Sequence, residues 1–339
     1  YRKLFSRATP LSAKGKGSLS FTGGASDPET LKTITEIGFK QPERADATVR
    51  GWHHGRYRAL RNTRARELLT ELLPSLMDAI SQTPDPDMAL LNFDEFLQGL
   101  PAGVQLFTMI KTNPQLMNLL AEIMGMAPRL AAHLTGRPVV LDSVLTPGFF
   151  ERIPSPTDLK KELKRSFEDA EYIEDILNIT RRWAHDRRFQ VGVQRLRKLT
   201  TSSEAAMDYS SIAETALECM FTPIADEFIA KHGDLAGGEM AFIAVGKLGS
   251  REMTANSDLD LIITYRALED ENESNGERPL STNQYFARLS QRQINALTVL
   301  TPEGGLFEVD MRLRPLGESG PIASRYSSLS TYYREQAWT

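Results

Sequence analysis

The sequence predicts a largely helical N-terminal region followed by a small α/β unit with a mixed sheet, the α + α/β fold class. Two observations support this prediction. Apolar residues recur with a period of about 3.6 over most of residues 29–232, as at positions 68, 69, 72, 73, 76 and 77. After Gly237-Gly238 the pattern changes to short apolar runs separated by turn and loop residues, which is typical of strands.

Prolines divide the helical region. Pro101, Pro114, Pro128 and Pro138 lie between predicted helices or at their starts, where proline is tolerated. Pro74 lies inside a periodic segment and should kink that helix. The connections are short, which favours a helical bundle or array. The predicted helices cover about 64–77, 87–99, 102–111, 114–125, 128–135, 156–170, 173–198 and 203–231.

The second region is expected to alternate strands with turns and one helix. The continuous apolar run at 240–245 predicts a buried strand. Residues 246–250 form a glycine turn, 258–265 a second strand, and the acidic residues 269–281 an exposed loop. Residues 283–300 follow as a helix, and 306–313 as a third strand.

Composition excludes several classes of protein. The 339 residues are 41% hydrophobic and 25% charged, which is ordinary for a globular chain. The single cysteine, Cys219, excludes an internal disulfide and suits a reducing, cytoplasmic setting. No apolar run of about 18 residues predicts a membrane span, and no signal-peptide pattern begins the chain. A basic stretch in residues 1–70 is interpreted as a solvated linker with flanking helix charges rather than a nucleic-acid site.

Two aspartates on the second predicted strand indicate a cation site. Strand geometry places residues i and i+2 on one face, so Asp258 and Asp260 share a face while Leu259 and Leu261 face the core. Adjacent carboxylates repel each other unless a cation neutralises them. Oxygen ligands without a nearby His or Cys favour Mg²⁺ or Mn²⁺ over Zn²⁺.

The third predicted strand carries a second set of charges. On an extended strand Glu308, Asp310, Arg312 and Arg314 would share one face. Asp310 would then complete the metal site, and Arg312 and Arg314 would neutralise a triphosphate with bidentate contacts. The alternative for this strand alone is a surface strand with salt bridges.

The glycine turn before the paired aspartates suits phosphate binding. Gly246 and Gly249 let backbone N–H groups approach a phosphate closely, and no Walker A pattern occurs. Followed by an Asp-x-Asp strand and a later strand aspartate, the turn completes the signature of the polymerase-β-like nucleotidyltransferase fold. Two divalent ions would lower the pKa of the attacking hydroxyl and stabilise the leaving pyrophosphate, with Asp310 helping to take the proton.

At these residues the chain resembles the bifunctional glutamine synthetase adenylyltransferase/adenylyl-removing enzyme family. That family's signatures look like GKLGG…SDLDL and YEVDxRLRPxGxxGP, and they stand here at residues 246–261 and 307–321. Residues 332–339 are similar to the C-terminal, AMP-adding half, and the helical stretch 56–142 is similar to the segment between the halves that precedes the AMP-adding domain. Ser250 replaces a glycine, Val245 replaces a tyrosine, and residues 254–256 differ from the usual pair.

The resemblance implies transfer of AMP from ATP to a tyrosine hydroxyl of glutamine synthetase, with a PII-type signal protein and glutamine as regulators. It implies Asp258, Asp260 and Asp310 as catalytic metal ligands. The ATP-binding positions would be Gly246, Lys247, Gly249, Ser250, Ser257, Arg312 and Arg314.

The expected domains follow from the resemblance and the patterns together. Residues 1–28 are a flexible linker or disordered segment, and 29–150 a helical inter-domain region. Residues 151–236 are a helical part leading into the catalytic domain, and 237–339 are its core. The absent N-terminal Met and the interrupted ending indicate a fragment truncated at its C-terminus.

Three alternatives stay open. The same aspartates would serve the adenylyl-removing half of the enzyme, which uses phosphate to release AMP. An RNA-directed nucleotidyltransferase would need a basic groove, yet residues 71–339 are net acidic. The helical region could instead be a regulatory binding module. The basic run 181–188 is interpreted as helix surface, with docking of a protein partner as the alternative.

Overall fold

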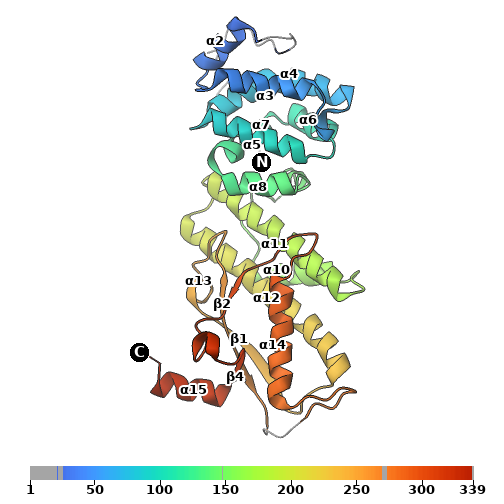
Figure 1. The fold of residues 1–339 in the computed structure, drawn as a ribbon, viewed down its shortest axis with the longest axis vertical. Helices are drawn as coiled ribbons and strands as arrows, with labels where there is room; N and C mark the ends of the chain where they lie inside the picture. Colours follow the sequence, from blue (N-terminus) through green and yellow to red (C-terminus); the bar gives the residue numbers. More distant parts are fainter. Residues whose placement is uncertain (1–20, 22–25, 147, 269–272, 338–339) are drawn as a thin grey trace. The chain divides into compact units, whose positions relative to one another are not determined.

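The computed structural model describes residues 21, 26–146, 148–268 and 273–337. The chain divides into two compact units, Tyr1–Phe149 and Phe150–Thr339, coloured in chain order in Figure 1. The predicted fold class is confirmed, because helices precede a small mixed sheet. The linker predicted at 1–28 lies mostly outside the described residues, as do positions 269–272 of the predicted loop 269–281.

Unit 1 consists of short helices whose starts are set by proline and capping side chains. Proline occupies the first turn of five of them, where its missing N–H costs no hydrogen bond. Asp27 and Asp85 accept backbone N–H groups at two of these starts. The elements are α2 (Pro28–Glu36), α3 (Pro42–His53), η1 (Arg58–Leu60), α4 (Thr63–Ser81), α5 (Pro86–Gly99), α6 (Val104–Thr112), α7 (Pro114–Met126), α8 (Pro128–Gly136) and α9 (Val140–Val144).

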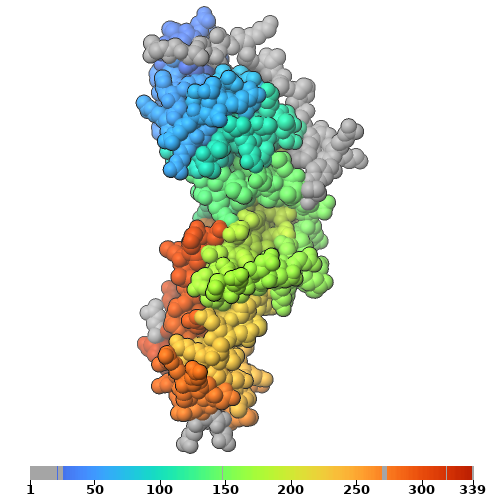
Figure 2. All heavy atoms as spheres, turned by 90° about the vertical axis from the view of Figure 1, so that its right-hand side faces the viewer, coloured from blue at the N-terminus to red at the C-terminus, as the bar shows by residue number. Residues whose placement is uncertain are grey.

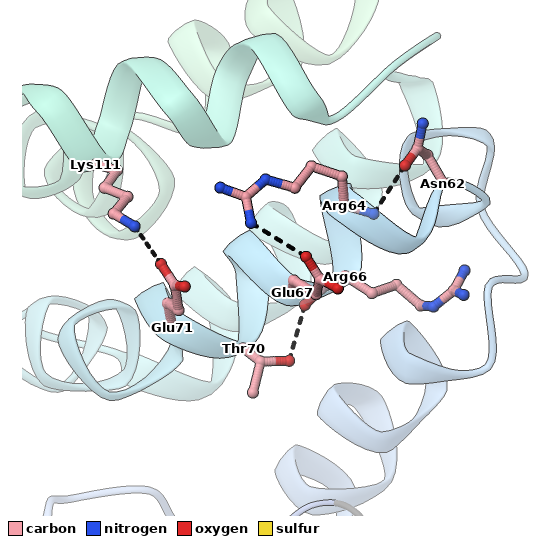
Figure 3. A network of polar contacts seen from close by, with 7 residues as sticks. All are labelled: Asn62, Arg64, Arg66, Glu67, Thr70, Glu71 and Lys111. Carbon is pink, nitrogen blue, oxygen red and sulfur yellow. Dashed lines mark hydrogen bonds and ion pairs between the residues drawn. The ribbon is translucent and has the colours of Figure 1, made fainter.

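Helix α4 is anchored by surface polar contacts (Figure 3). Asn62 caps it by accepting the N–H of Arg64 at 2.8 Å, and Glu67 pairs with Arg64 one turn further on. Glu71 pairs with Lys111 of α6. These ion pairs are about half exposed, so they contribute little to stability. The helix continues through Pro74.

The core of unit 1 is aromatic and aliphatic. Trp52 and Phe93 are buried and meet edge to face, with ring centroids 5.7 Å apart. The indole N–H of Trp52 donates to Asp94 at 2.6 Å, so burial of the large ring leaves no unpaired donor. Burial of these side chains from α3 and α5, rather than the surface pairs, holds unit 1 together.

Unit 2 combines long helices with the sheet. Its longest helix, α12, is capped by Thr201 and Glu204 in a capping box and ends at Gly233. In Figure 2 the C-terminal part of α12 (yellow) lies against α14 (orange). The elements are α10 (Pro156–Ser166), α11 (Ile173–Leu196), α12 (Ser202–His232), β1 (Glu239–Ala244), α13 (Gly246–Gly249), β2 (Leu259–Arg266), α14 (Thr282–Thr298), β3 (Val309–Asp310), η2 (Gly317–Ser319), β4 (Ala323–Arg325) and α15 (Tyr326–Glu335).

Strand β2 is the centre of the sheet. It pairs antiparallel with β1 and parallel with both β3 and β4. Its side chains at 259, 261, 263 and 265 are buried against the two cores formed with α11, α12 and α14. Leu259 and Leu261 therefore face the interior as predicted, and strand alternation turns Asp258 and Asp260 to the opposite face.

The prediction that the first strand is buried was wrong. β1 begins at Glu239 and pairs only with β2 among the described residues, so it lies at an edge of the sheet. Met240 and Phe242 pack on the core, while Ala241 and Ile243 on the other face are exposed. A continuous apolar run does not distinguish an edge strand from a central one.

The third strand is much shorter than its predicted span of 306–313. β3 comprises only Val309 and Asp310. The carboxylate of Asp310 accepts the backbone N–H of Arg312 at 2.8 Å, and Arg314 N–H donates to Met311 O at 3.2 Å. This local side-chain hydrogen bond turns the chain and ends the strand.

None of the helices formed by the described residues is both long and apolar enough to cross a bilayer.

Candidate active site

The three predicted aspartates converge at one end of the paired strands. Asp260 lies opposite Asp310 in the parallel register of β2 and β3, and Asp258 immediately precedes β2. Leu259 N–H donates to Glu308 O at 2.9 Å, which fixes this register. One carboxylate oxygen from each aspartate lies within 4.8 Å of the others. The geometry thus brings together side chains about 50 positions apart in sequence.

Asp258 and Asp310 line an open hollow of about 430 Å³. Partial burial raises the pKa of Asp260, and the charges of Asp258 and Asp310 raise it further. The positive charges of Arg312 and Lys247 lower the pKa of Asp260 and so partly offset this rise. The hollow is lined by Asp258, Glu308, Val309, Asp310, Met311, Arg312 and Arg314.

Arg312 supplies the counter-charge of Asp310. Its Nε donates to both carboxylate oxygens, at 3.0 and 2.8 Å, and its Nη2 forms a further ion pair with Oδ2. These hydrogen bonds lower the pKa of Asp310 below its ordinary value. The pKa of Asp260 is therefore raised and the pKa of Asp310 is lowered, although the two residues lie opposite each other.

Arg312 and Arg314 do not extend the carboxylate face as predicted, because the strand ends at Asp310. Arg314 lines the same hollow, but its guanidinium donates to Met311 O at 2.9 Å and to Gly320 O at 3.3 Å. The two arginines differ in accessibility: Arg312 is exposed, whereas Arg314 is half-buried and braces the turn after β3.

The predicted glycine turn packs directly against Asp260. Val245 N–H donates to Asp260 O at 3.0 Å, and the next residue, Gly246, has a φ of 53°. A Cβ at Gly246 would lie 2.1 Å from Asp260 Oδ2, so no side chain fits there. A Cβ at Gly249 would lie 2.7 Å from Ala244 O. Gly246 is therefore required by the side chain of Asp260, and Gly249 by the backbone of Ala244.

The predicted serines hold the loop between the turn and β2. Ser257 is buried, and its hydroxyl accepts the N–H of Thr254 at 3.0 Å. Ser250 is exposed and donates to Glu252 at 3.0 Å. Lys247 is exposed on α13, and its charge acts on Asp260. Of these residues, Lys247 is the one whose charge reaches the carboxylates.

Sequence reasoning missed the support that α11 gives to the site. Arg188, placed in the predicted surface run 181–188, is half-buried and donates to the backbone of the segments that precede β2 and β3. The available signal was the spacing of Arg181, His185 and Arg188, which places all three on one helix face.

The fold and the site define the class of nucleotidyltransferases. A mixed sheet carries paired aspartates after a glycine turn, and a third aspartate on the neighbouring strand faces them. The chain belongs to the glutamate-ammonia ligase adenylyltransferase (GlnE) family, whose profile matches residues 117–339.

Relatives match along the whole chain. The relative from Mesorhizobium japonicum is 43% identical to this chain, that from Agrobacterium fabrum 44% and that from Brucella melitensis 43%, each over 339 residues. Each is named bifunctional glutamine synthetase adenylyltransferase/adenylyl-removing enzyme. The match covers 100% of this chain and 34% of each relative, so the chain spans about a third of their length.

Proposed function

We propose that this chain transfers AMP from ATP to a tyrosine hydroxyl of glutamine synthetase and so helps to regulate nitrogen assimilation. The observation that carries the proposal is the convergence of Asp258, Asp260 and Asp310 beside a glycine turn, in a chain of the adenylyltransferase family. The names of the relatives support glutamine synthetase as the acceptor.

The donor set fits a divalent cation. Three carboxylates within 4.8 Å of one another offer oxygen ligands only, which Mg²⁺ and Mn²⁺ prefer. The raised pKa of Asp260 reflects partial burial and a local excess of negative charge, which a cation would relieve. When bound, two such ions would activate the attacking hydroxyl and stabilise the leaving pyrophosphate.

The residues of the chain then have separate roles. Asp258, Asp260 and Asp310 would hold the metal, and the turn at Gly246–Gly249 would let backbone N–H groups approach the phosphates. Lys247 and Arg312 are exposed cations beside the carboxylates and suit the negative charge of ATP.

Asp310 is proposed to help take the hydroxyl proton, and this requires a movement. In the structure Arg312 holds both oxygens of Asp310 and lowers its pKa, which makes the carboxylate a weaker base. Transfer of Arg312 from Asp310 to a phosphate oxygen of ATP would restore the basicity of Asp310 as the substrate binds.

The partners are proposed on the family resemblance. A PII-type signal protein and glutamine would act as regulators, with the helical residues 29–236 as the region that senses them. The acidic charge of residues 71–339 supports a protein acceptor over RNA, because a nucleic-acid groove needs excess positive charge.

Incubation with glutamine synthetase, Mg²⁺ and ATP labelled at the α-phosphate tests the proposal. Label should appear on the synthetase with the wild-type chain and be lost with an Asp258→Asn, Asp260→Asn double variant. A matched control, Asp94→Asn in unit 1, should retain transfer. Release of pre-attached AMP only in the presence of phosphate would instead establish the adenylyl-removing reaction, and salt-sensitive labelling of RNA would establish a nucleic-acid substrate.

A further inference from the structure

One face of α11 carries two arginines and a histidine whose side chains contact backbone carbonyl groups near the sheet. Arg181, His185 and Arg188 are spaced i, i+4 and i+7, so they project from the same side of the helix. His185 Nε2 lies 3.0 Å from Gly305 O. Each of the three has at least one contact with the segment between α14 and β3, residues 299–307.

Arg188 contacts two segments at once. Its Nη1 donates to Leu306 O at 3.3 Å, and its Nη2 donates to Ala255 O. Its guanidinium also lies over the ring of Phe307, 5.2 Å from the centroid. Ala255 is three positions before Asp258, and Leu306 is four positions before Asp310. One planar group therefore joins the chain entering β2 to the chain entering β3.

The environment of Arg188 is apolar for a cation. Burial lowers the pKa of its guanidinium, and burial raises the pKa of neighbouring Tyr209 to about 12. The phenol of Tyr209 is thus neutral at physiological pH and offers Arg188 no counter-charge. This half-buried cation is compensated by two carbonyl oxygens and an aromatic face, and that compensation is strong only while both segments stay in place.

We propose that Arg188 is a positioning residue for the carboxylate triad, setting the separation of Asp258 and Asp260 from Asp310 by bridging the segments that precede them. The inference rests on the proposed function, because a triad that binds no cation needs no fixed separation. β3 pairs with β2 through only two residues, so its ladder alone fixes the register weakly. The guanidinium fork adds a second, independent tie.

Arg181 provides a matched comparison on the same helix face. It is fully buried and donates to Gly304 O at 3.0 Å, Ala296 O at 2.8 Å and Val299 O at 2.7 Å. These acceptors lie at the end of α14 and in the following turn, farther along the chain from the aspartates. Loss of Arg181 should loosen that turn and lower stability without changing the geometry of the triad.

The test measures Mn²⁺ binding to the 339-residue chain by electron paramagnetic resonance, at a temperature where circular dichroism shows each variant to be folded. Arg188→Lys keeps the charge but cannot span both carbonyls, and Arg188→Met keeps the aliphatic stem and buries no charge. Each should weaken Mn²⁺ binding roughly tenfold, the size of effect seen when groups supporting metal ligands are removed. Arg181→Lys should bind Mn²⁺ within about twofold of wild type, although it unfolds at a lower temperature.

Two outcomes would overturn the inference: wild-type Mn²⁺ affinity in a folded Arg188 variant, or equal weakening by Arg181→Lys, which would indicate general loosening. Because Arg188→Met removes the need to bury a charge, it keeps the test decisive if Arg188→Lys does not fold. Failure of the proposed function has a different signature. In that case the wild type and the Asp258→Asn, Asp260→Asn variant would bind Mn²⁺ equally.

Discussion

At the scale of single residues, Gly246 determines how closely the glycine turn approaches the carboxylates. Two independent observations require glycine at this position. Its φ is positive, and a Cβ built there would lie only 2.1 Å from Asp260 Oδ2. The spacing of the glycines in the sequence predicted a turn near phosphate. It could not predict that the turn packs on the side chain of Asp260, which depends on the register of β2.

Gly246→Ala should therefore damage both folding and function. We expect the free energy of unfolding to fall by about 1–3 kcal/mol from backbone strain. AMP transfer should fall about 100-fold, because Asp260 must move away from the added methyl group. Gly51→Ala in α3 is the control, since it has open space and no positive φ, and should stabilise the chain by about 0.4–1 kcal/mol. Wild-type transfer by Gly246→Ala in an assay with labelled ATP would refute this account of the turn.

The opposite pKa shifts of Asp260 and Asp310 give a second prediction. The folded-state pKa of Asp260 lies above 3.8, so its contribution destabilises the fold as the pH rises through that pKa. Without divalent cations at pH 7, Asp260→Asn should raise the Tm by about 1–3 °C. This advantage should shrink as the pH falls toward about 4, the ordinary range of the carboxyl.

Asp310→Asn should have the opposite effect. The folded-state pKa of Asp310 lies below 3.8, so its stabilisation is present above that pH and is lost as the pH falls through the folded-state value. The variant should therefore melt at a lower temperature than wild type at pH 7. Thermal melts in EDTA at pH 7 and pH 4 measure both variants, and a lower Tm for Asp260→Asn at pH 7 would contradict the proposed charge repulsion.

At the scale of secondary-structure elements, periodicity predicted the helices at 87–135, the long helices of unit 2 and strand β2 well, but it predicted the extent of strand β3 poorly. The long helices of unit 2 and strand β2 lie where their apolar patterns indicated, because each buries apolar side chains over several turns or pleats. The shared face of Asp258 and Asp260 followed from the same two-residue period. These features are local, so the sequence pattern alone was sufficient.

Strand β3 and helix α11 show why the rest could not be predicted. The alternation at 306–314 resembles a long strand, yet the Asp310 side chain binds the N–H of Arg312 and turns the chain. The basic run on α11 resembles helix surface, yet Arg181 is fully buried on carbonyl oxygens. In both cases a specific polar contact overrides the average behaviour of the residue type.

The packing of α14 on the sheet gives a prediction at this scale. Phe286 is buried and stacks on Tyr265 of β2 with ring centroids 4.2 Å apart. Phe286→Ala should lower the free energy of unfolding by about 3–5 kcal/mol, while Phe286→Leu should cost clearly less because it retains most of the volume. Urea unfolding measures the free energy of unfolding of each variant, and hydrogen exchange at the amides of β2 shows whether that strand is the part that loses stability. Equal losses for both variants would mean that the ring stack, not the filled volume, stabilises α14.

At the scale of the whole molecule, the chain combines a helical unit with a nucleotidyltransferase-like unit and belongs to the glutamate-ammonia ligase adenylyltransferase family. It covers about a third of the length of its relatives, whose names include both addition and removal of AMP. The proposed triad would suit either direction of transfer, because both reactions would pass through the same phosphorus centre. Whether AMP is added or removed would therefore depend on the substrates that the site binds. ATP and an unmodified acceptor would lead to addition, and inorganic phosphate and a modified acceptor would lead to removal.

Anomalous X-ray diffraction from crystals of the chain grown with Mn²⁺ and a non-hydrolysable ATP analogue would test the role of the triad most directly. We expect a manganese peak in contact with Asp258, Asp260 and Asp310, with the triphosphate beside the turn at Gly246. An ordered analogue bound elsewhere, or manganese that avoids all three carboxylates, would contradict the proposed site.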